Sequence, residues 1–558
     1  MEKQKEYDIR KFISNLIDSN INKEFHYIMS KYSEYSKYEL ICYSLLYMEN
    51  GFKQSAFSKD ITYSDAGNKR TILEWFIKKL IGESIQSHKF IYDNNKYNKF
   101  DDILAEIFIL CGNDLMNRQF KQHRGINKIL IEENEANEII FKVPTIVDEL
   151  DCQDSYYWGE FTDNNSVELE KRLKNAVIER IFSKYFKEPH TLEKHKSIND
   201  FIFMNKIDFE IYELCKQNIK VDIDKIGSDF KSNLFSNSQE LIDIISVFFY
   251  LSKINSFKDS ILDAGGSILY KTLNIYNKTM LIKIFEKFNI SNSEKVNKII
   301  DYFTIKCECS WGINEFPLIN IDDNIMWVPS SFIMNDFQFS IVNGHYDKDI
   351  TLISRDDTVS QSIVDNIINR CSMYDNIIIS ENKEYFDKNH KYKGKELKSD
   401  IDVALYDRIS NTILVIECKW KENIYIKGNK YDKICDSVDK IYKKQLNKHK
   451  YFLELEEKNV DYIFDNNIDI KNRPYFPQIE YIFVDKRVQL HYNNQHALSE
   501  FNLLKLILES SSENILRIDT LIYKIKRLQT EVEYDIKDTI NEIDFKGSKI
   551  KNSIFLIK

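Results

Sequence analysis

Several residue types and segments are scarce or missing in this chain, and each absence narrows the class of protein. The 558 residues include only nine cysteines, with no paired spacing. This suits a reducing cytosol, where cysteine serves as a small apolar residue. The amino-terminal stretch 1–5 is charged and has no apolar signal core, and the longest largely apolar run, 244–251, is far shorter than a membrane span. We therefore expect a cytoplasmic protein with no membrane partner.

The first 300 residues lack any motif that indicates a particular reaction or ligand. They contain no phosphate-binding loop of the Walker type, no repeat of fixed period and no long low-complexity linker. Helical periodicity does recur there, for example in 167–186, where Leu169, Leu173, Val177 and Ile181 are each four residues apart. We predict that residues 1–300 are mainly helical, with room for two subdomains, and serve sensing, recognition or oligomerisation. Residues 301–350 are predicted to form a short β connection.

The most informative stretch lies between Lys398 and Lys419. It predicts two β-strands, 398–405 and 412–419, joined by a tight turn at 410–411. With that turn, Asp402 lies opposite Lys419, and Glu417 is its diagonal neighbour. Glu417 and Lys419 are two residues apart and point to the same face of their strand. Two carboxylates and an amine thus converge at one sheet edge, which is what a metal-dependent phosphodiesterase needs.

This stretch resembles the motif of the PD-(D/E)XK nuclease superfamily. Asp402 matches the first acid of that motif, Glu417 the second and Lys419 the lysine, whereas Ile401 stands where some members have proline. A bare Glu-x-Lys triplet carries little weight, because about a dozen acid-x-base triplets are expected from 87 acidic and 78 basic residues. The weight comes from the apolar, β-branched run 412–416 before it, which is typical of a buried central strand. The alternative interpretation is an ordinary hairpin with surface charges.

The surrounding pattern extends the resemblance to residues 351–510. The elements expected there are a helix at 356–373, a strand at 376–380, a polar loop at 385–398, the hairpin, a helix at 430–454, a strand at 479–484 and a helix at 497–508. The resemblance implies an α/β domain of the restriction-endonuclease-like fold, with an αβββαβ core. We expect the mainly α-helical region to precede it and a C-terminal helical tail, 511–558, to follow it.

Gln445 is a fourth candidate for the active site. It interrupts the apolar stripe of helix 430–454, which includes Val438, Ile441 and Phe452. A buried amide needs hydrogen-bond partners, and some nucleases of the superfamily carry a glutamine on this helix. The alternative is a boundary position at which the helix leaves the core.

The residue types indicate the chemistry. Mg²⁺ prefers hard oxygen ligands and keeps several waters, so two carboxylates and a main-chain carbonyl make a suitable site. We assign Asp402, Glu417 and the carbonyl of Cys418 as ligands, with Mn²⁺ as a substitute metal. Lys419 would stabilise the transition state or orient the attacking water. The resemblance implies products with 5′-phosphates.

The charge distribution favours a polyanionic partner. The whole chain has a formal net charge of −9, yet the stretch 419–450 has ten lysines against four acids, and 388–398 has five lysines against one acid. We expect Lys421, Lys443, Lys444 and Lys448 to contact nucleic acid. The alternative is a lysine-rich composition that places lysine on every surface.

These observations predict a metal-dependent nuclease, most consistent with a DNA endonuclease. A role in bacterial restriction or anti-phage defence rests on analogy with other superfamily nucleases fused to large helical regions. An RNase and a non-cleaving nucleic-acid-binding or scaffold protein are the alternatives. Clustered acids disfavour the non-cleaving alternative, because they repel one another without a metal. A regulatory protein partner or a homo-oligomer would restrain the activity.

Overall fold

The computed structural model divides the chain into two compact units, residues 1–14, 117–161 and 355–558 in the first and residues 15–116 and 162–354 in the second. The residues that it describes are 2–57, 63–120, 130–133, 139–145, 164–182, 207–224, 226, 231–235, 237–262, 272–307, 312–313, 315–335, 337–338, 340–342, 352–353, 359–420, 430–468, 470, 475–486, 490–492, 495–527, 534–545 and 548–557.

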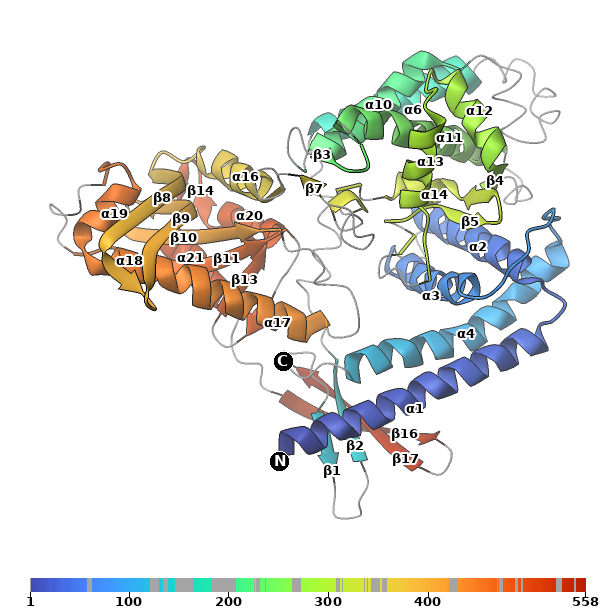
Figure 1. Ribbon diagram of the computed structural model, residues 1–558, viewed down its shortest axis with the longest axis horizontal. Helices are drawn as coiled ribbons and strands as arrows, with labels where there is room; N and C mark the ends of the chain where they lie inside the picture. Colours follow the sequence, from blue (N-terminus) through green and yellow to red (C-terminus); the bar gives the residue numbers. More distant parts are fainter. Residues whose placement is uncertain are drawn as a thin grey trace. The chain divides into compact units, whose positions relative to one another are not determined.

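The N-terminal region is mainly helical, as the sequence predicts (Figure 1). Its helices are α1 (Glu2–Lys31), α2 (Lys37–Phe57), α3 (Tyr63–Ile81), α4 (Asn94–Phe120), α6 (Asn164–Ala176), the π-helix η1 (Val177–Phe182), α10 (Phe209–Asp224), α11 (Ser238–Leu262), α12 (Lys278–Lys287), α13 (Ser293–Tyr302) and α14 (Pro329–Ile333).

Short strands interrupt these helices. Strand β6 (Asn324–Trp327) pairs with both β4 (Asn274–Asn277) and β5 (Ile319–Ile321), while β3 (Lys231–Ser232) pairs with β7 (Leu352–Ile353). The stretch 301–350, predicted as a β connection, thus contributes β5 and β6 to a three-stranded sheet inside the second unit. Trp327 is fully buried there and stacks on Tyr276, with ring centroids 5.1 Å apart.

The first unit is built on a mixed six-stranded sheet. Its strand order is β12-β13-β11-β10-β9-β8, in which β11 runs parallel to β10 and to β13 and the other neighbours are antiparallel. The strands are β8 (Ile377–Tyr392), β9 (Lys395–Asp407), β10 (Thr412–Lys419), β11 (Gln478–Asp485), β12 (Leu490–Tyr492) and β13 (Gln495–Ser499). Strand β10 is central, and seven of its eight residues are buried, which confirms the buried central strand expected from its apolar run.

Helices cover this sheet. Helices α17 (Lys430–Ile441), α18 (Asn447–Leu455) and α19 (Glu457–Ile463) pack on one side of it, where Phe452 and Val460 meet Ile413 and Val415 of β10. Helix α16 (Gln361–Cys371) lies on the other side (Figure 1) and contacts α20 (Glu500–Glu509). The helix predicted at 356–373 corresponds to α16, and the apolar residues spaced four apart in that stretch, Val359, Ile363, Ile367 and Cys371, are all fully buried.

The turn between β9 and β10 spans four residues, 408–411, rather than the two that the sequence suggests. The cause is Asp407, whose carboxylate accepts hydrogen bonds from the Ile409 amide at 2.8 Å and from the Ser410 hydroxyl at 2.5 Å. Asn411 completes the turn in the left-handed region, at φ 51°. Thr412 therefore pairs with Asp407, and the register differs by two residues from the prediction.

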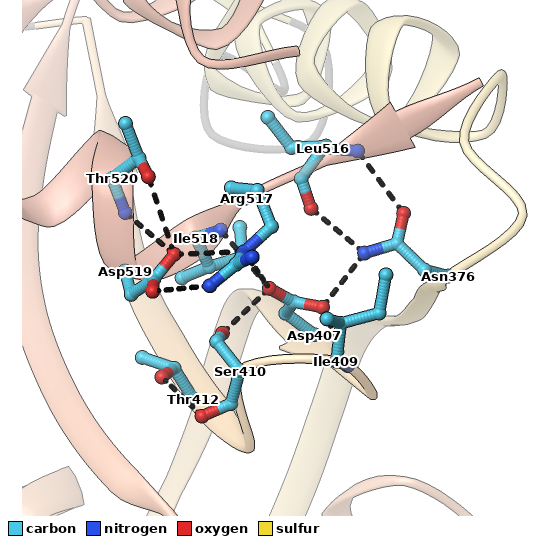
Figure 2. A network of polar contacts seen from close by, with 10 residues as sticks. All are labelled: Asn376, Asp407, Ile409, Ser410, Thr412, Leu516, Arg517, Ile518, Asp519 and Thr520. Atoms are coloured by element: carbon cyan, nitrogen blue, oxygen red, sulfur yellow. Dashed lines mark hydrogen bonds and ion pairs between the residues drawn. The ribbon is translucent and has the colours of Figure 1, made fainter. Parts of the chain in front are cut away.

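Asp407 also joins the sheet to the segment that follows it. Its side chain, fully buried, accepts further hydrogen bonds from the Asn376 amide at 2.7 Å and from the backbone N–H of Ile518 at 3.2 Å, at the start of α21 (Ile518–Arg527). Asn376 in turn bonds to both backbone groups of Leu516. Figure 2 shows how these groups surround the one carboxylate.

Two other predicted elements need correction. The stretch 385–398, expected as a polar loop, forms a β-hairpin in which β8 and β9 continue to a turn at Lys393 and Gly394, both with positive φ (49° and 78°). The closing helix begins at Glu500 rather than at 497, because Ser499 caps it by accepting a hydrogen bond from the Asn502 amide and residues 495–499 pair as β13.

The C-terminal stretch 511–558 is not the helical tail that was expected. After the short hairpin β14 (Ser511–Ser512) and β15 (Ile515–Leu516), it holds helix α21 and then strands β16 (Tyr534–Phe545) and β17 (Ser548–Ile557). These two strands join β1 (Leu130–Glu133) and β2 (Ile139–Thr145) in the order β1-β2-β17-β16. Among the described residues, no helix combines the length and apolarity needed to span a bilayer.

We predict that Asp407→Ala lowers the free energy of unfolding by about 3–5 kcal/mol, because four hydrogen-bond donors then lose their shared buried acceptor. Denaturant titration measures this change. Asp375→Ala, at an exposed aspartate one residue before Asn376, is the matched control and should change stability by less than about 0.5 kcal/mol. Equal effects of the two substitutions would contradict the role given to Asp407.

Candidate active site

Asp402, Glu417 and Lys419 meet near the end of β10. The Lys419 ammonium lies 3.0 Å from Glu417 Oε1 and 3.5 Å from Asp402 Oδ2, and it bridges the two acids. The N–H of Cys418 donates a 2.7 Å hydrogen bond to Asp402 Oδ2. Glu417 and Lys419 lie two and four residues after Val415 on β10, and Asp402 lies two residues before Ala404 on β9. Val415 and Ala404 both belong to the core under α18, so the side chains of Asp402, Glu417 and Lys419 share the sheet face that α18 covers.

The register changes which residues are neighbours. Ile416 pairs with Val403, so the next step of the ladder brings Glu417, and not Lys419, level with Asp402. Lys419 is then the diagonal neighbour. The predicted convergence of the three residues is observed, whereas the predicted pairing of Asp402 with Lys419 is wrong. The two-residue shift preserves the face, since side chains alternate with a period of two.

Burial splits the pKa values of the two acids. Asp402 is 7% exposed, and its burial, followed by the negative charge of Glu417, raises its pKa to about 7. Burial acts in the same direction on Glu417, which is 1% exposed, but the hydrogen bond with His449 and the charge of Lys419 outweigh it and lower the Glu417 pKa. For Lys419, burial is outweighed by Glu417 and Asp402, so its pKa is raised. Near neutral pH, Glu417 carries the charge and Lys419 stays an ammonium ion.

His449 is a part of the site that the sequence analysis missed. Its Nε2 lies 3.1 Å from Glu417 Oε2, and its Nδ1 lies 2.9 Å from the hydroxyl of Tyr385 on β8. The predicted single helix 430–454 is interrupted by the π-helix η4 (Tyr442–Leu446) between α17 and α18. A π turn holds one more residue than an α turn. The buried face therefore passes from Ile441 to Leu446 and then to His449.

The same π turn explains the position of Gln445. Its side chain is half-buried and forms no hydrogen bond with Asp402, Glu417 or Lys419 in the described structure. The neighbouring Leu446 is the residue that enters the core. This geometry agrees with a boundary position, and a role for Gln445 in the active site stays a prediction. A helical wheel with a constant 3.6-residue period could not have shown this.

The predicted nucleic-acid contacts fall into three groups. Lys421 lies outside the described residues. Lys443 and Lys444 are exposed on η4, and the carbonyl oxygen of Lys443 accepts hydrogen bonds from Tyr392 and Lys393 of the β8–β9 hairpin. Lys448 is half-buried and donates a 2.9 Å hydrogen bond to the carbonyl of Lys398 on β9.

An open groove of about 870 Å³ runs beside these contacts. It is lined by residues of both hairpin strands and by one residue of α18, namely Glu384, Gly394, Lys395, Glu396, Lys398, Ser399, Asp400 and Lys448. Asp400 is two residues from Asp402 on the same strand. The groove therefore begins close to the candidate site, and its wall carries three lysines and three acidic residues.

The donor set suits a hard cation, although it is small. Among the described residues, no group of three or more histidine, cysteine, aspartate or glutamate side chains is placed to hold a metal ion. Two carboxylates remain, Asp402 and Glu417, and Mg²⁺ is commonly bound by one or two carboxylates with waters in the other positions. The raised pKa of Asp402 shows that a second negative charge is unfavourable here without a cation. That is the electrostatic situation a divalent ion relieves.

Comparisons with protein-family models, with curated proteins and with solved structures find no match to this chain. A function is therefore inferred from the residues of the site.

We predict that Asp402→Asn stabilises the metal-free protein as pH rises. The folded-state pKa of Asp402, about 7, is above the ordinary value of 3.8. The folded form thus keeps a proton that the unfolded form loses between those pH values, and its stability falls across that window. Asparagine removes this penalty and still accepts a hydrogen bond from Cys418, so the gain should grow from pH 4 to pH 7 towards an upper limit of about 4 kcal/mol.

Denaturant titrations in the presence of a chelator measure this gain. Asp365→Asn, at an exposed aspartate of α16, is the control and should show no such pH-dependent gain. If Asp402→Asn is no more stable than wild type at pH 7, the charge of Asp402 does not destabilise the folded protein, and the raised pKa is contradicted.

Proposed function

We propose that this chain is a Mg²⁺-dependent nuclease that hydrolyses phosphodiester bonds in DNA, with an active site of the PD-(D/E)XK type. One observation carries the proposal. The buried carboxylates of Asp402 on β9 and Glu417 on β10 both lie within 3.5 Å of the partly exposed Lys419 ammonium. The order α16, β8, β9, β10, α17–α18, β11 also agrees with the αβββαβ core of that fold.

Each residue of the site has a role that its contacts support. Asp402 and Glu417 would hold the ion, and the main-chain carbonyl of Cys418 is a further proposed ligand. When bound, Mg²⁺ supplies Lewis-acid chemistry that acidifies water and neutralises charge on a phosphate. The Lys419 side chain, 25% exposed, can turn from the carboxylates to a phosphate oxygen and donate to it as an ammonium group. Its raised pKa keeps it charged, so it donates rather than removes a proton.

The lysines near the groove support a polyanionic substrate. Those of the β8–β9 hairpin and of η4 and α18 come together because the hairpin contacts the helix through Tyr392, Lys393 and Lys448. Lysines outnumber acids near the hairpin tip, with five against one in 388–398, although the chain as a whole has a net charge of −9. DNA is the polymer that the superfamily resemblance favours.

We also propose a cytoplasmic role in bacterial restriction or anti-phage defence. A nuclease that cuts its host's DNA is harmful, and the helical N-terminal region offers a means to restrain it through a regulatory partner or through self-association. Cleavage by the purified wild-type chain without any partner would contradict a restraint that only a regulatory partner releases.

We predict metal-dependent cleavage that Glu417→Gln and Lys419→Met each reduce by at least about 100-fold, since each removes a charged group from the reaction centre. The assay uses plasmid, linear and single-stranded DNA, and RNA, with Mg²⁺, Mn²⁺ or EDTA. If only RNA is cleaved, the substrate is RNA rather than DNA. Tight binding without cleavage would favour the scaffold alternative.

The matched controls for this assay are Glu457→Gln and Lys458→Met, at two exposed residues of α19. Both should cleave like wild type. Activity that survives Glu417→Gln and Lys419→Met would overturn the site assignment.

We predict that Mg²⁺ or Mn²⁺ stabilises the wild-type protein at pH 7–8 and does not stabilise Asp402→Asn. Ligand at 100 times its Kd stabilises the folded state by about 2.7 kcal/mol, and the asparagine variant lacks the charge that binds the ion. Thermal unfolding with and without metal measures the difference. Identical metal-induced shifts in the two proteins would place the ion elsewhere.

A further inference from the structure

A buried chain of hydrogen bonds ends on Glu417 from the side away from Lys419. His449 is 1% exposed, and its Nε2 lies 3.1 Å from Glu417 Oε2, while Lys419 contacts Oε1. The imidazole Nδ1 lies 2.9 Å from the Tyr385 hydroxyl. The chain therefore runs from Tyr385 on β8 through His449 to a proposed metal ligand.

The chemistry of the ends fixes the direction of these bonds. An ionised carboxylate accepts only, so the hydrogen between His449 and Glu417 belongs to Nε2. For the neutral imidazole, Nδ1 is then the acceptor and the Tyr385 hydroxyl donates to it. The tautomer is assigned from this network.

Packing holds the chain in place. The rings of Tyr385 and Phe452 are stacked, with centroids 3.9 Å apart and an interplanar angle of 10°. Tyr385 is 2% exposed, and the π-helix η4 gives α18 the rotation that presents His449 to the sheet. π turns inside helices are frequent at functional sites. Nothing in this arrangement can move away without opening the core.

Lys419 and His449, the two side chains that contact Glu417, thus differ in how easily another group can take their place. Lys419 is 25% exposed on its side chain and can be replaced at Oε1 by a cation, whereas the His449 side chain, 1% exposed, cannot leave Oε2. We propose that His449 is a positioning residue. It holds Glu417 by Oε2 and keeps Oε1 directed to the ion site, with Tyr385 fixing the tautomer. This inference rests on the proposed function, since it assumes a metal bound by Glu417.

The test is Mn²⁺ binding to the full-length protein, measured by calorimetry without substrate. Removal of a residue that supports a metal ligand typically weakens metal affinity 10–100-fold. We expect this loss in His449→Phe, which fills the space but donates no hydrogen bond. His449→Gln can still donate and should bind Mn²⁺ within about threefold of wild type. His390→Phe, at the histidine that contacts Asp387 near the hairpin tip, is the matched control and should leave the affinity unchanged.

A second measurement keeps the inference open to refutation if His449→Phe does not fold. The ¹⁵N chemical shifts of histidine-labelled wild-type protein report which imidazole nitrogen carries the proton. We expect protonated Nε2 at His449, with a Nδ1 shift that changes in Tyr385→Phe. A bare Nε2, or a folded His449→Phe that binds Mn²⁺ as tightly as wild type, would overturn the positioning role. Mn²⁺ binding without cleavage of any polymer counts against the proposed nuclease instead, and wild-type protein that binds no Mn²⁺ contradicts both.

Discussion

The register between β9 and β10 is the constraint on which the candidate site depends. Asp407 sets it, because this single buried carboxylate shapes the turn at 408–411 and anchors α21. The turn lies about five residues from Asp402 along β9, yet it decides that Glu417, rather than Lys419, is level with Asp402. A structural aspartate at one end of a hairpin thus determines the arrangement of charges towards the other end.

This arrangement buries charged groups, which destabilises the folded protein. Two carboxylates with little exposure repel each other, and the protein offsets the repulsion in different ways for each. Glu417 is held by an ammonium group and an imidazole, while Asp402 has a backbone N–H and a longer contact with Lys419. The opposite pKa shifts of the two acids follow from these unequal partners. Two buried carboxylates of this kind are only partly stabilised by the side chains and the backbone N–H around them.

The sequence predicts the parts of this domain that depend on short-range periodicity. The buried strand 412–416, the helix face of Val359, Ile363 and Ile367 and the convergence of the acids with Lys419 all follow from alternation and spacing, and the structure agrees with them. The helical character of the N-terminal region follows in the same way. No interaction between distant residues is needed for any of these inferences.

The errors arise where one side chain or one extra residue overrides the period. Asp407 lengthens a turn, Ser499 delays a helix start, and the π turn at 442–446 moves Gln445 off the core face and brings His449 onto it. The lysine-rich composition of 385–398 suggested a loop, although Tyr385 and Leu397 are buried by pairing and packing. Asp407 and Ser499 act through hydrogen bonds to residues two or three positions away, which an apolar period does not reveal. The burial of Tyr385, in contrast, depends on a distant partner, Phe452.

Strand β8 lies at the edge of the sheet and is 16 residues long. A long edge strand presents unpaired backbone groups that can pair with the same edge of another molecule. Lysines along β8, such as Lys383, Lys388 and Lys391, and the irregular pairing between Asp387 and Lys391 oppose such pairing. The lysines near the hairpin tip, five against one acid in 388–398, consequently protect the molecule from aggregation. Replacing them with neutral residues would lower the solubility of the protein.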